Sequence, residues 1–424
     1  MRFPTRFPTR FPRRFALAGL GAWLLAAAIP FAFAQLDVDF GGRAGAEFGV
    51  AIDGSLPVAA AELELRIDGE VGSGFFPDAT FTASLVGGYD AATGAADVRL
   101  GDAFGTLYLG DLDLSIGQQK VFWGSTDAVN PVDVLNPRDM ALPLASEKIA
   151  VPMLRAVYHL DDVLRLEAAA VPAFTPSTPP GDAWRAAPVP PTQLPPGVTI
   201  VEQRAPDERR PEAALENVTF GVRATARFDG FDASLNYVRG FRHLPTLETT
   251  LVPTDTPGAF ALQPVLRYDR VHLVGTDFSG TLGPVVVRGE AAYTFTDDPE
   301  GTDPAVGNPS LQAVLGAEYA IPSGPRAVVQ AIYDWRKGEA GEDDEQLLKA
   351  MTALSYQADA RTQLELAWMQ SFDGSGAIVP RASYTFAEGV TGEASAFVFY
   401  GADGTEFGGW KENAQLRLGV AYGF

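Results

Sequence analysis

The 424-residue sequence contains no cysteine and only three histidines. Without cysteine, neither disulfide bonds nor a lipid-modified cysteine can form. His159, His243 and His272 lie far apart in the sequence, and none stands beside a Ser-x-Gly turn that would present a nucleophile. We therefore expect no enzyme, no catalytic residue and no cofactor. Acidic runs at 296–303 and 341–346 are interpreted as solvated loops rather than Ca²⁺ or Mg²⁺ sites.

Long apolar runs and positive charge are also scarce. Residues 1–34 combine five arginines, one apolar stretch and a final Ala-Phe-Ala, the pattern of a signal peptide cleaved before Gln35; an N-terminal membrane anchor is the alternative. No later stretch of 18 apolar residues predicts a transmembrane helix. Without those five arginines, 27 of the 32 basic residues remain beside 53 acidic ones, a formal net charge of −26. This charge excludes nucleic acid as a partner.

Strict alternation of polar and apolar residues is the dominant pattern of the rest of the chain. In residues 62–70, charged side chains occupy every second position, and Leu63, Leu65 and Ile67 lie between them. The same period of two runs through 163–172, 218–228, 285–295, 361–372 and 415–424. About eighteen such segments of about ten residues predict an all-β fold, a transmembrane antiparallel up-and-down β-barrel over residues 35–424. Sixteen strands are the alternative count.

The connections between these segments alternate in length. Short turns are expected at 160–163, 228–231, 321–326, 357–361 and 387–390. Long loops are expected at 124–148, 175–217, 243–263, 297–308 and 338–346. This alternation is typical of outer-membrane barrels, whereas a soluble β-sandwich or propeller does not require it. Four tryptophans are predicted to form an aromatic girdle at the long-loop ends of strands, namely Trp123, Trp335, Trp368 and Trp410.

The C-terminus carries an aromatic residue in register with the alternation. Its apolar positions are Leu416, Leu418, Val420, Tyr422 and the final Phe424. This register resembles the sorting signal of Gram-negative outer-membrane barrels. The resemblance implies the cell outer membrane as the location, with outer-membrane lipid and the barrel-assembly machinery as partners.

The stretch WGSTDAVNPVDVLNPRD, residues 123–139, contains two Asn-Pro pairs that favour turns. Together with the preceding LDLSIGQQKVF, it resembles a family of porin-like outer-membrane proteins whose role is not settled, and more distantly general porins whose third loop narrows the barrel. The resemblance implies an inward third loop at about 125–147 that presents pore charges to the lumen, namely Asp127, Asp133, Arg138 and Asp139. The alternative is a lid over the barrel mouth.

Physical reasoning independently favours the inward course, because turn-rich backbone at membrane depth is tolerated only where protein buries it or water fills the space. Val132, Val134 and Leu135 alternate with the charged residues and could attach such a loop to the wall.

Charged residues on the polar faces of the strands are expected to line the lumen, because a basic side chain facing lipid near the midplane costs roughly 2–4 kcal/mol. Consecutive strands place four arginines on one basic wall of the constriction: Arg155, Arg165, Arg223 and Arg227. Glu62 and Glu64, with Asp68 and Glu70, are expected across from it. Mixed charge is expected elsewhere, at Arg288, Glu290, Glu365 and Arg417.

A charged lumen holds water, so the sequence predicts a channel for passive, selective diffusion of small hydrophilic solutes. Two alternatives stay open. A barrel for lipid or polysaccharide export would have an apolar lumen, and a closed structural or adhesive barrel would fill its interior with charge pairs. The Pro-rich loop at 175–217 is interpreted as an extended outer segment.

Overall fold

The computed structural model describes residues 35–72, 77–127, 129–141, 144, 146–181, 184 and 199–424. The expected signal peptide at 1–34 lies outside the described residues, as does most of the Pro-rich part of the outer loop, at 185–198.

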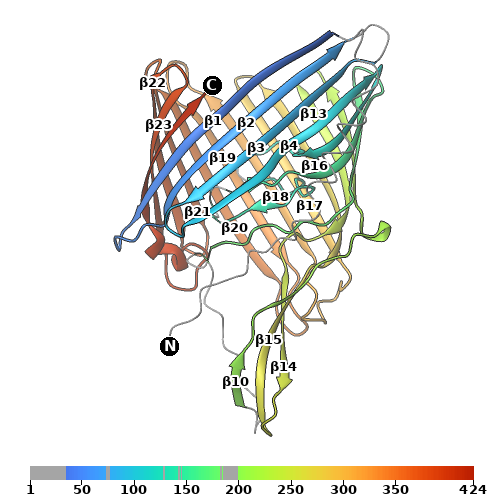
Figure 1. Ribbon diagram of the computed structural model, residues 1–424, viewed down its shortest axis with the longest axis vertical. Coiled ribbons are helices and arrows are strands. Elements are labelled where there is room, and N and C mark those ends of the chain that lie inside the picture. The colour runs from blue at the N-terminus through green and yellow to red at the C-terminus, as the bar shows by residue number, and fades with distance from the viewer. Residues whose placement is uncertain are drawn as a thin grey trace.

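Eighteen antiparallel strands form one closed barrel (Figure 1). They are β1 (Gln35–Ala51), β2 (Val58–Gly72), β3 (Ala79–Asp90), β4 (Ala95–Leu109), β5 (Leu112–Gln119), β8 (Val151–His159), β9 (Leu164–Val171), β12 (Thr219–Phe228), β13 (Phe231–Phe241), β16 (Arg270–Leu282), β17 (Val285–Thr296), β18 (Ser310–Ala320), β19 (Arg326–Arg336), β20 (Glu345–Gln357), β21 (Thr362–Ser371), β22 (Gly376–Ala387), β23 (Val390–Tyr400) and β24 (Gln415–Gly423). Each pairs with the next, and β24 pairs with β1. The predicted 18-strand barrel is confirmed, and the 16-strand alternative is wrong.

Connections are short turns at one rim and mostly longer loops at the other, as predicted. The two-residue turns after β12 and β16 contain Gly230 and Gly283, whose φ angles of 72° and 61° suit glycine best. At the long-loop rim, the third loop covers 120–150, the fourth 172–218 and the fifth 242–269.

The fourth and fifth loops contain regular structure that their sequences did not predict. A second sheet projects beyond the rim (Figure 1) and is built from β10 (Thr199–Gln203), β11 (Asp207–Arg209), β14 (Thr246–Pro253) and β15 (Ala259–Arg267). Two-residue strands β6 (Arg138–Asp139) and β7 (Glu147–Lys148) pair within the third loop. Short 3₁₀ helices are η3 (Leu215–Asn217) and η4 (Gly408–Asn413). The long loop expected at 243–263 lies within the connection from β13 to β16, and β14 and β15 form a hairpin inside it.

Side chains on the outer face of the barrel are apolar and exposed. Leu63, Leu65 and Ile67 on β2 are 38–48% exposed, and the alternating C-terminal residues Leu416 to Phe424 are 48–55% exposed. A closed barrel with an apolar outer face requires hydrocarbon around it. No helix in the described part of the chain is long and apolar enough to cross a membrane.

The expected aromatic girdle holds for two of the four tryptophans. Trp368 is 43% exposed, and Trp335 stacks on Tyr293 of the outer face. Trp123, however, is 2% exposed and packs in an interior cluster, and Trp410 packs edge-on against Phe407 in another. Trp123 and Trp410 are not part of the girdle, because both lie in loops rather than at outward positions of a strand.

Leu65 lies in the middle of β2 and faces lipid, so Leu65→Arg should lower the free energy of unfolding of the barrel by about 2–4 kcal/mol. The measurement is reversible urea unfolding of protein folded into lipid vesicles. Glu64→Gln, one residue away on the inward face, is the matched control and should change stability by less than about 1 kcal/mol. Equal losses in both variants would contradict the assigned register.

Candidate functional site: the third loop inside the barrel

The third loop packs against the inner wall. Its apolar side chains Val121, Trp123, Val132 and Leu135 are at most 4% exposed. They form one cluster with inward-facing wall residues, which are Val151, Met153, Ala169, Val171, Val238, Leu273 and Ala292. Val132 and Leu135 thus contact the wall as the sequence suggested, and the partly buried Val134 packs against the same cluster.

Small wall residues make room for this loop. A Cβ added to Gly221 would lie 2.8 Å from the Trp123 ring and 3.0 Å from a Leu135 methyl group. A Cβ added to Gly275 would lie 2.6 Å from a Val132 methyl group. Because protein interiors are close-packed, larger residues at these positions would displace the loop.

Asp133 is the centre of a buried ionic cluster rather than a pore charge. Its Oδ1 accepts hydrogen bonds from the Trp123 backbone N–H at 3.0 Å and from Lys148 Nζ at 2.5 Å, and its Oδ2 accepts one from Arg138 Nη2 at 3.1 Å. The side chains of Asp133 and Lys148 are each 2% exposed. The expectation that Asp133 faces the lumen is therefore wrong.

Lys148 was not singled out from the sequence, yet it joins both ends of the loop. Its ammonium group also donates to the Val121 carbonyl and lies 4.1 Å from the centre of the Phe122 ring. Burial lowers the pKa of Lys148, and the adjacent Asp133 carboxylate partly offsets that decrease.

The two Asn-Pro pairs supply structure, as their turn chemistry suggested. The Asp133 backbone N–H donates to the Asn130 carbonyl at 3.1 Å, closing a turn around the first pair. In the second pair, the Asn136 side chain makes three hydrogen bonds. Its Oδ1 accepts one from the Val121 backbone N–H at 2.8 Å, and its Nδ2 donates to the Gln119 and Ile149 carbonyls at 3.0 Å each. Asn136 thereby fastens the two ends of the loop together.

Glu290 on β17 holds the start of the loop against the wall. Its Oε1 accepts from the Ser125 N–H at 2.5 Å, and from the Thr126 N–H and hydroxyl at 2.7 and 2.8 Å. The residue faces inward, as predicted, but is only 4% exposed because the loop covers it. Glu290 is therefore a loop anchor, and the expectation that it lines the open lumen is wrong.

The loop continues around the wall and then reaches its far side. Val129 packs against Val314, Ile332 and their neighbours on β18 to β20. Leu144 packs against the Phe397 and Phe399 cluster, on β23. Since β23 is the seventeenth barrel strand and β8 the sixth, the loop contacts nearly opposite parts of an eighteen-strand circumference.

The remaining motif residues keep partial exposure. Asp127 has a side chain that is 40% exposed and lies 3.5 Å from Arg288 Nη1. Arg138 is 34% exposed while it pairs with Asp133. Asp139 is exposed, and its Oδ1 accepts from the Ala141 N–H at 3.0 Å.

The four arginines of the expected basic wall do lie on adjacent strands, but two carboxylates lie among them. Arg155 on β8 makes two hydrogen bonds to Glu167 on β9, at 2.9 and 3.0 Å. Arg165 lies 3.9 Å from the same carboxylate. Arg223 on β12 donates to Asp277 on β16 at 2.8 Å. The wall therefore carries charge pairs as well as excess positive charge.

Arg165 and Arg227 supply that excess. Arg227 is exposed and has no ion pair within the described ranges, and Arg165 makes only the long contact to Glu167. Glu167 and Asp277 were not predicted, although both occupy inward positions in register with the arginines. Glu167 is opposite Arg223 in the pairing of β9 with β12. The alternation along β9 and β16 places both residues on the inward face, so it would have identified them.

Glu167 also links this wall to the loop, because it accepts a hydrogen bond from Trp123 Nε1 at 2.8 Å. The Trp123 ring, the Glu167 carboxylate and the Arg155 guanidinium thus form one chain of contacts. Because Trp123 and Arg155 share the Glu167 carboxylate, the loop helps to orient the Arg155 side chain in the lumen.

The other expected lumen residues face inward, and most of them form ion pairs. Glu62 pairs with Arg99 at 2.6 Å, and Arg417 with Glu47 at 2.9 Å. Glu64 is half-buried, and Arg288 pairs with Glu318 at 2.6 Å. Glu62 and Glu64 do not lie across from the basic wall, since β2 is only four to six strands away from β8 and β12.

A mixed acidic group occupies that facing wall instead. Arg381 on β22 lies 3.6 Å from Glu365 on β21 and 3.0 Å from Glu393 on β23. These are the fifteenth to seventeenth strands, opposite β8, β9 and β12. The lumen therefore presents excess positive charge on one side and excess negative charge on the other.

His243 connects the third, fourth and fifth loops at the outer rim. Its Nδ1 lies 3.0 Å from the Thr175 carbonyl and its Nε2 3.2 Å from the Val134 carbonyl, and its ring stacks on Phe174. Burial lowers the pKa of the His243 imidazole. Across the described residues, no group of three His, Asp or Glu side chains is arranged to hold a metal ion.

Asp133→Asn should release the third loop, because it leaves the Lys148 ammonium buried without its carboxylate at a cost of about 3–5 kcal/mol. We expect faster hydrogen–deuterium exchange across residues 121–149, measured by mass spectrometry on the folded barrel. Asp139→Asn removes an exposed carboxylate from the same loop and should leave exchange unchanged. Adding Lys148→Met to Asp133→Asn should restore much of the protection, and protection unchanged in Asp133→Asn would contradict the anchoring role.

Comparisons with known proteins agree with this architecture. The solved structure of OccD3 (OpdP) from Pseudomonas aeruginosa matches at a TM-score of 0.55 and 10% identity, covering 91% of this chain and 91% of that one. OccAB1 from Acinetobacter baumannii matches at a TM-score of 0.55 and 10% identity, covering 92% and 96%. OccK5 (OpdH) from P. aeruginosa matches at 0.51 and 10% identity, covering 92% and 98%. No curated protein sequence matches the chain.

The likeness to these structures shows a shared porin-like barrel fold, and the apolar outer face of the closed barrel indicates the outer membrane. A family profile described as "Protein of unknown function (DUF1302)" matches residues 73–421. This match spans most of the barrel, and the chain belongs to the DUF1302 family.

Proposed function

We propose that this barrel is an outer-membrane channel for the passive, selective diffusion of small hydrophilic solutes, without catalytic activity, and that its third loop sets the width. The supporting observation is that the loop is bound to the wall while charged side chains beside it keep access to solvent. Arg155 is 29% and Arg165 27% exposed, beside 40% for Asp127. A loop that filled the lumen would bury these charges at high cost.

The charged interior favours water-soluble solutes over lipid. An export channel for lipid needs an apolar lining, whereas the inward positions of β8, β9 and β12 carry arginine and glutamate. Basic excess on one side and acidic excess on the other would orient solutes that carry both charges, and rings of charge tune ion preference.

Single-channel conductance in planar bilayers tests the proposal. We expect steady open steps from the intact protein, and larger steps after deletion of residues 126–140, because that deletion removes the part of the loop that lies in the lumen. A deletion of equal length at 249–263, in the projecting β14–β15 hairpin, should leave conductance near that of the intact protein. Steps only after the 126–140 deletion would mean that the loop is a plug, and no steps in any protein would overturn the channel.

Ion preference gives a second prediction. Arg165→Gln should shift the ratio of anion to cation permeability toward cations by roughly twofold or more, because the weakly paired Arg165 raises the local anion concentration. The measurement is the reversal potential under a salt gradient. Arg209→Gln removes the same charge from the outer loop, where Asp207 pairs with it at 3.0 Å, and should have little effect. Equal shifts in both variants would remove the basic wall from the selectivity mechanism.

A further inference from the structure

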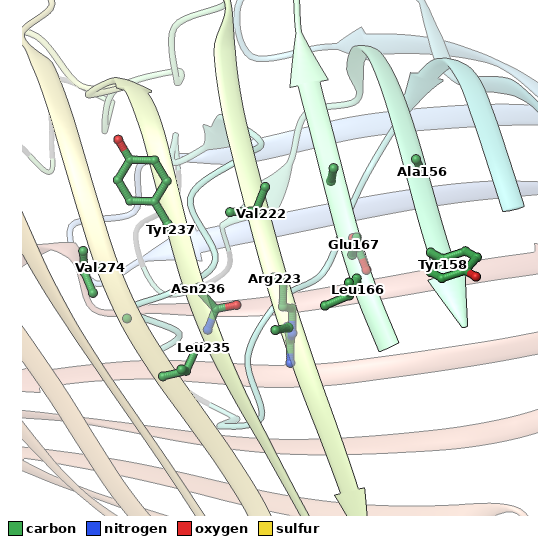
Figure 2. Close-up of a pocket in the computed structure, with 13 residues that line it drawn as sticks. Ala156, Tyr158, Leu166, Glu167, Val222, Arg223, Leu235, Asn236, Tyr237 and Val274 are labelled. Atoms are coloured by element: carbon green, nitrogen blue, oxygen red, sulfur yellow. The ribbon is translucent and has the colours of Figure 1, made fainter. Parts of the chain in front are cut away.

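The outer face of the barrel contains an apolar groove of about 590 Å³ across β8, β9, β12, β13 and β16 (Figure 2). Its large exposed side chains are Tyr158, Leu166, Leu235 and Val274, which are 41–68% exposed. Smaller residues lie between them, namely Ala156, Ala168, Val222 and Ala224. The volume falls within the roughly 300–1,000 Å³ typical of ligand pockets.

Two arginines lie next to this groove, on the long-loop side. Arg239 follows Tyr237 on β13 at the next outward position, and Arg270 lies two outward positions before Val274 on β16. Their outward direction follows from parity, since the intervening Val238 and Leu273 are buried in the inner cluster. Such arginines are unusual on a lipid-facing surface and belong at headgroup depth, where long basic side chains reach the interface.

The two guanidinium groups converge on one backbone carbonyl group. Arg239 Nη2 and Arg270 Nη1 both donate to the Glu216 carbonyl oxygen, at 3.2 and 3.0 Å. Arg270 also donates to Asn217 Oδ1 at 2.7 Å and lies over the Phe241 ring, 4.7 Å from its centre. Neither arginine forms an ion pair with a carboxylate in the part of the chain that the structure describes. Two cations sharing one neutral acceptor favour binding of an anion between them.

Aromatic side chains show that this pair lies at the membrane interface. Tyr293 packs on Phe295 and stacks on Trp335, all at the long-loop ends of β17 and β19. Tyr and Trp in such a girdle mark the depth of the lipid headgroups. His272, opposite Arg239 in the strand pairing, lies 2.8 Å from the Tyr237 hydroxyl through its Nδ1, so polar groups continue from the arginines to the groove.

We propose that this surface binds a phosphate-bearing, acylated lipid of the outer leaflet. Arg239 and Arg270 hold the phosphate, and the groove from Val274 to Tyr158 holds an acyl chain. The occupant is a lipid because both halves of its chemistry, an anionic headgroup and a hydrocarbon tail, match adjacent parts of one membrane-facing surface. The proposal concerns the outer face alone and holds whether or not the lumen conducts.

Binding can be measured on the full barrel in phosphatidylcholine nanodiscs that contain a minor fraction of lipid A, with retained lipid A counted by native mass spectrometry. The double substitution Arg239→Gln/Arg270→Gln should weaken retention by about tenfold or more, since each arginine near the surface attracts an anionic headgroup. The matched control is Arg209→Gln/Arg210→Gln. It removes two charges from the fourth loop, at the long-loop rim, where Asp207 pairs with Arg209 at 3.0 Å and Glu208 with Arg210 at 2.7 Å. This variant should retain lipid A normally.

A second variant separates the acyl chain from the phosphate. Ala168→Leu/Ala224→Leu fills the groove with apolar side chains at lipid-facing positions, so the barrel should fold, both arginines should stay in place and lipid A retention should fall. Added inorganic phosphate should compete poorly with lipid A on the intact protein. Normal retention by the filled-groove variant, or full displacement by inorganic phosphate, would overturn the lipid site in favour of a simple anion site. Equal retention by all variants would overturn the proposal entirely.

Discussion

Backbone hydrogen bonding in hydrocarbon is the constraint on which this structure depends. Inside a bilayer no water is available to pair with N–H and C=O groups, so each strand must pair along both edges. The barrel meets this condition by closing β24 on β1, where Gly42 and Phe424 exchange hydrogen bonds at 2.9 and 3.1 Å. Once closed, the two faces of every strand have fixed environments, with lipid outside and the lumen inside.

The third loop meets the same constraint with side chains, because it has no neighbouring strand along most of its length. Asn136 pairs with backbone groups at both ends of the loop, Asp133 accepts from the Trp123 amide, and Glu290 accepts from two amides of the loop. The carboxylates and amides therefore replace strand partners where the backbone is irregular. Asp127 and Arg138, whose side chains make no hydrogen bond to the loop backbone within the described residues, keep the greater access to the lumen.

The difference between the strand-paired wall and the side-chain-paired third loop explains which features could be predicted from the sequence. Strand number, loop parity and the lipid-facing register follow from a period of two that local sequence carries directly. Asp133 was assigned to the lumen through the resemblance to porin-like proteins, and Glu290 through the parity of its strand. Neither argument shows what covers the position. Their burial depends on the path of the loop and on residues distant in sequence. Trp123 was misplaced for the same reason, since the alternating pattern ends before it.

The contacts of the third loop also impose an order on assembly. The backbone N–H of Ser125 reaches Glu290, 165 residues later in the chain, and Val132 packs over Gly275. Contacts of such long range form slowly, because the intervening chain must first be brought together. The loop can reach its final position only after β16 and β17 have joined the growing wall. We therefore expect the loop to narrow the interior of the barrel only late in folding.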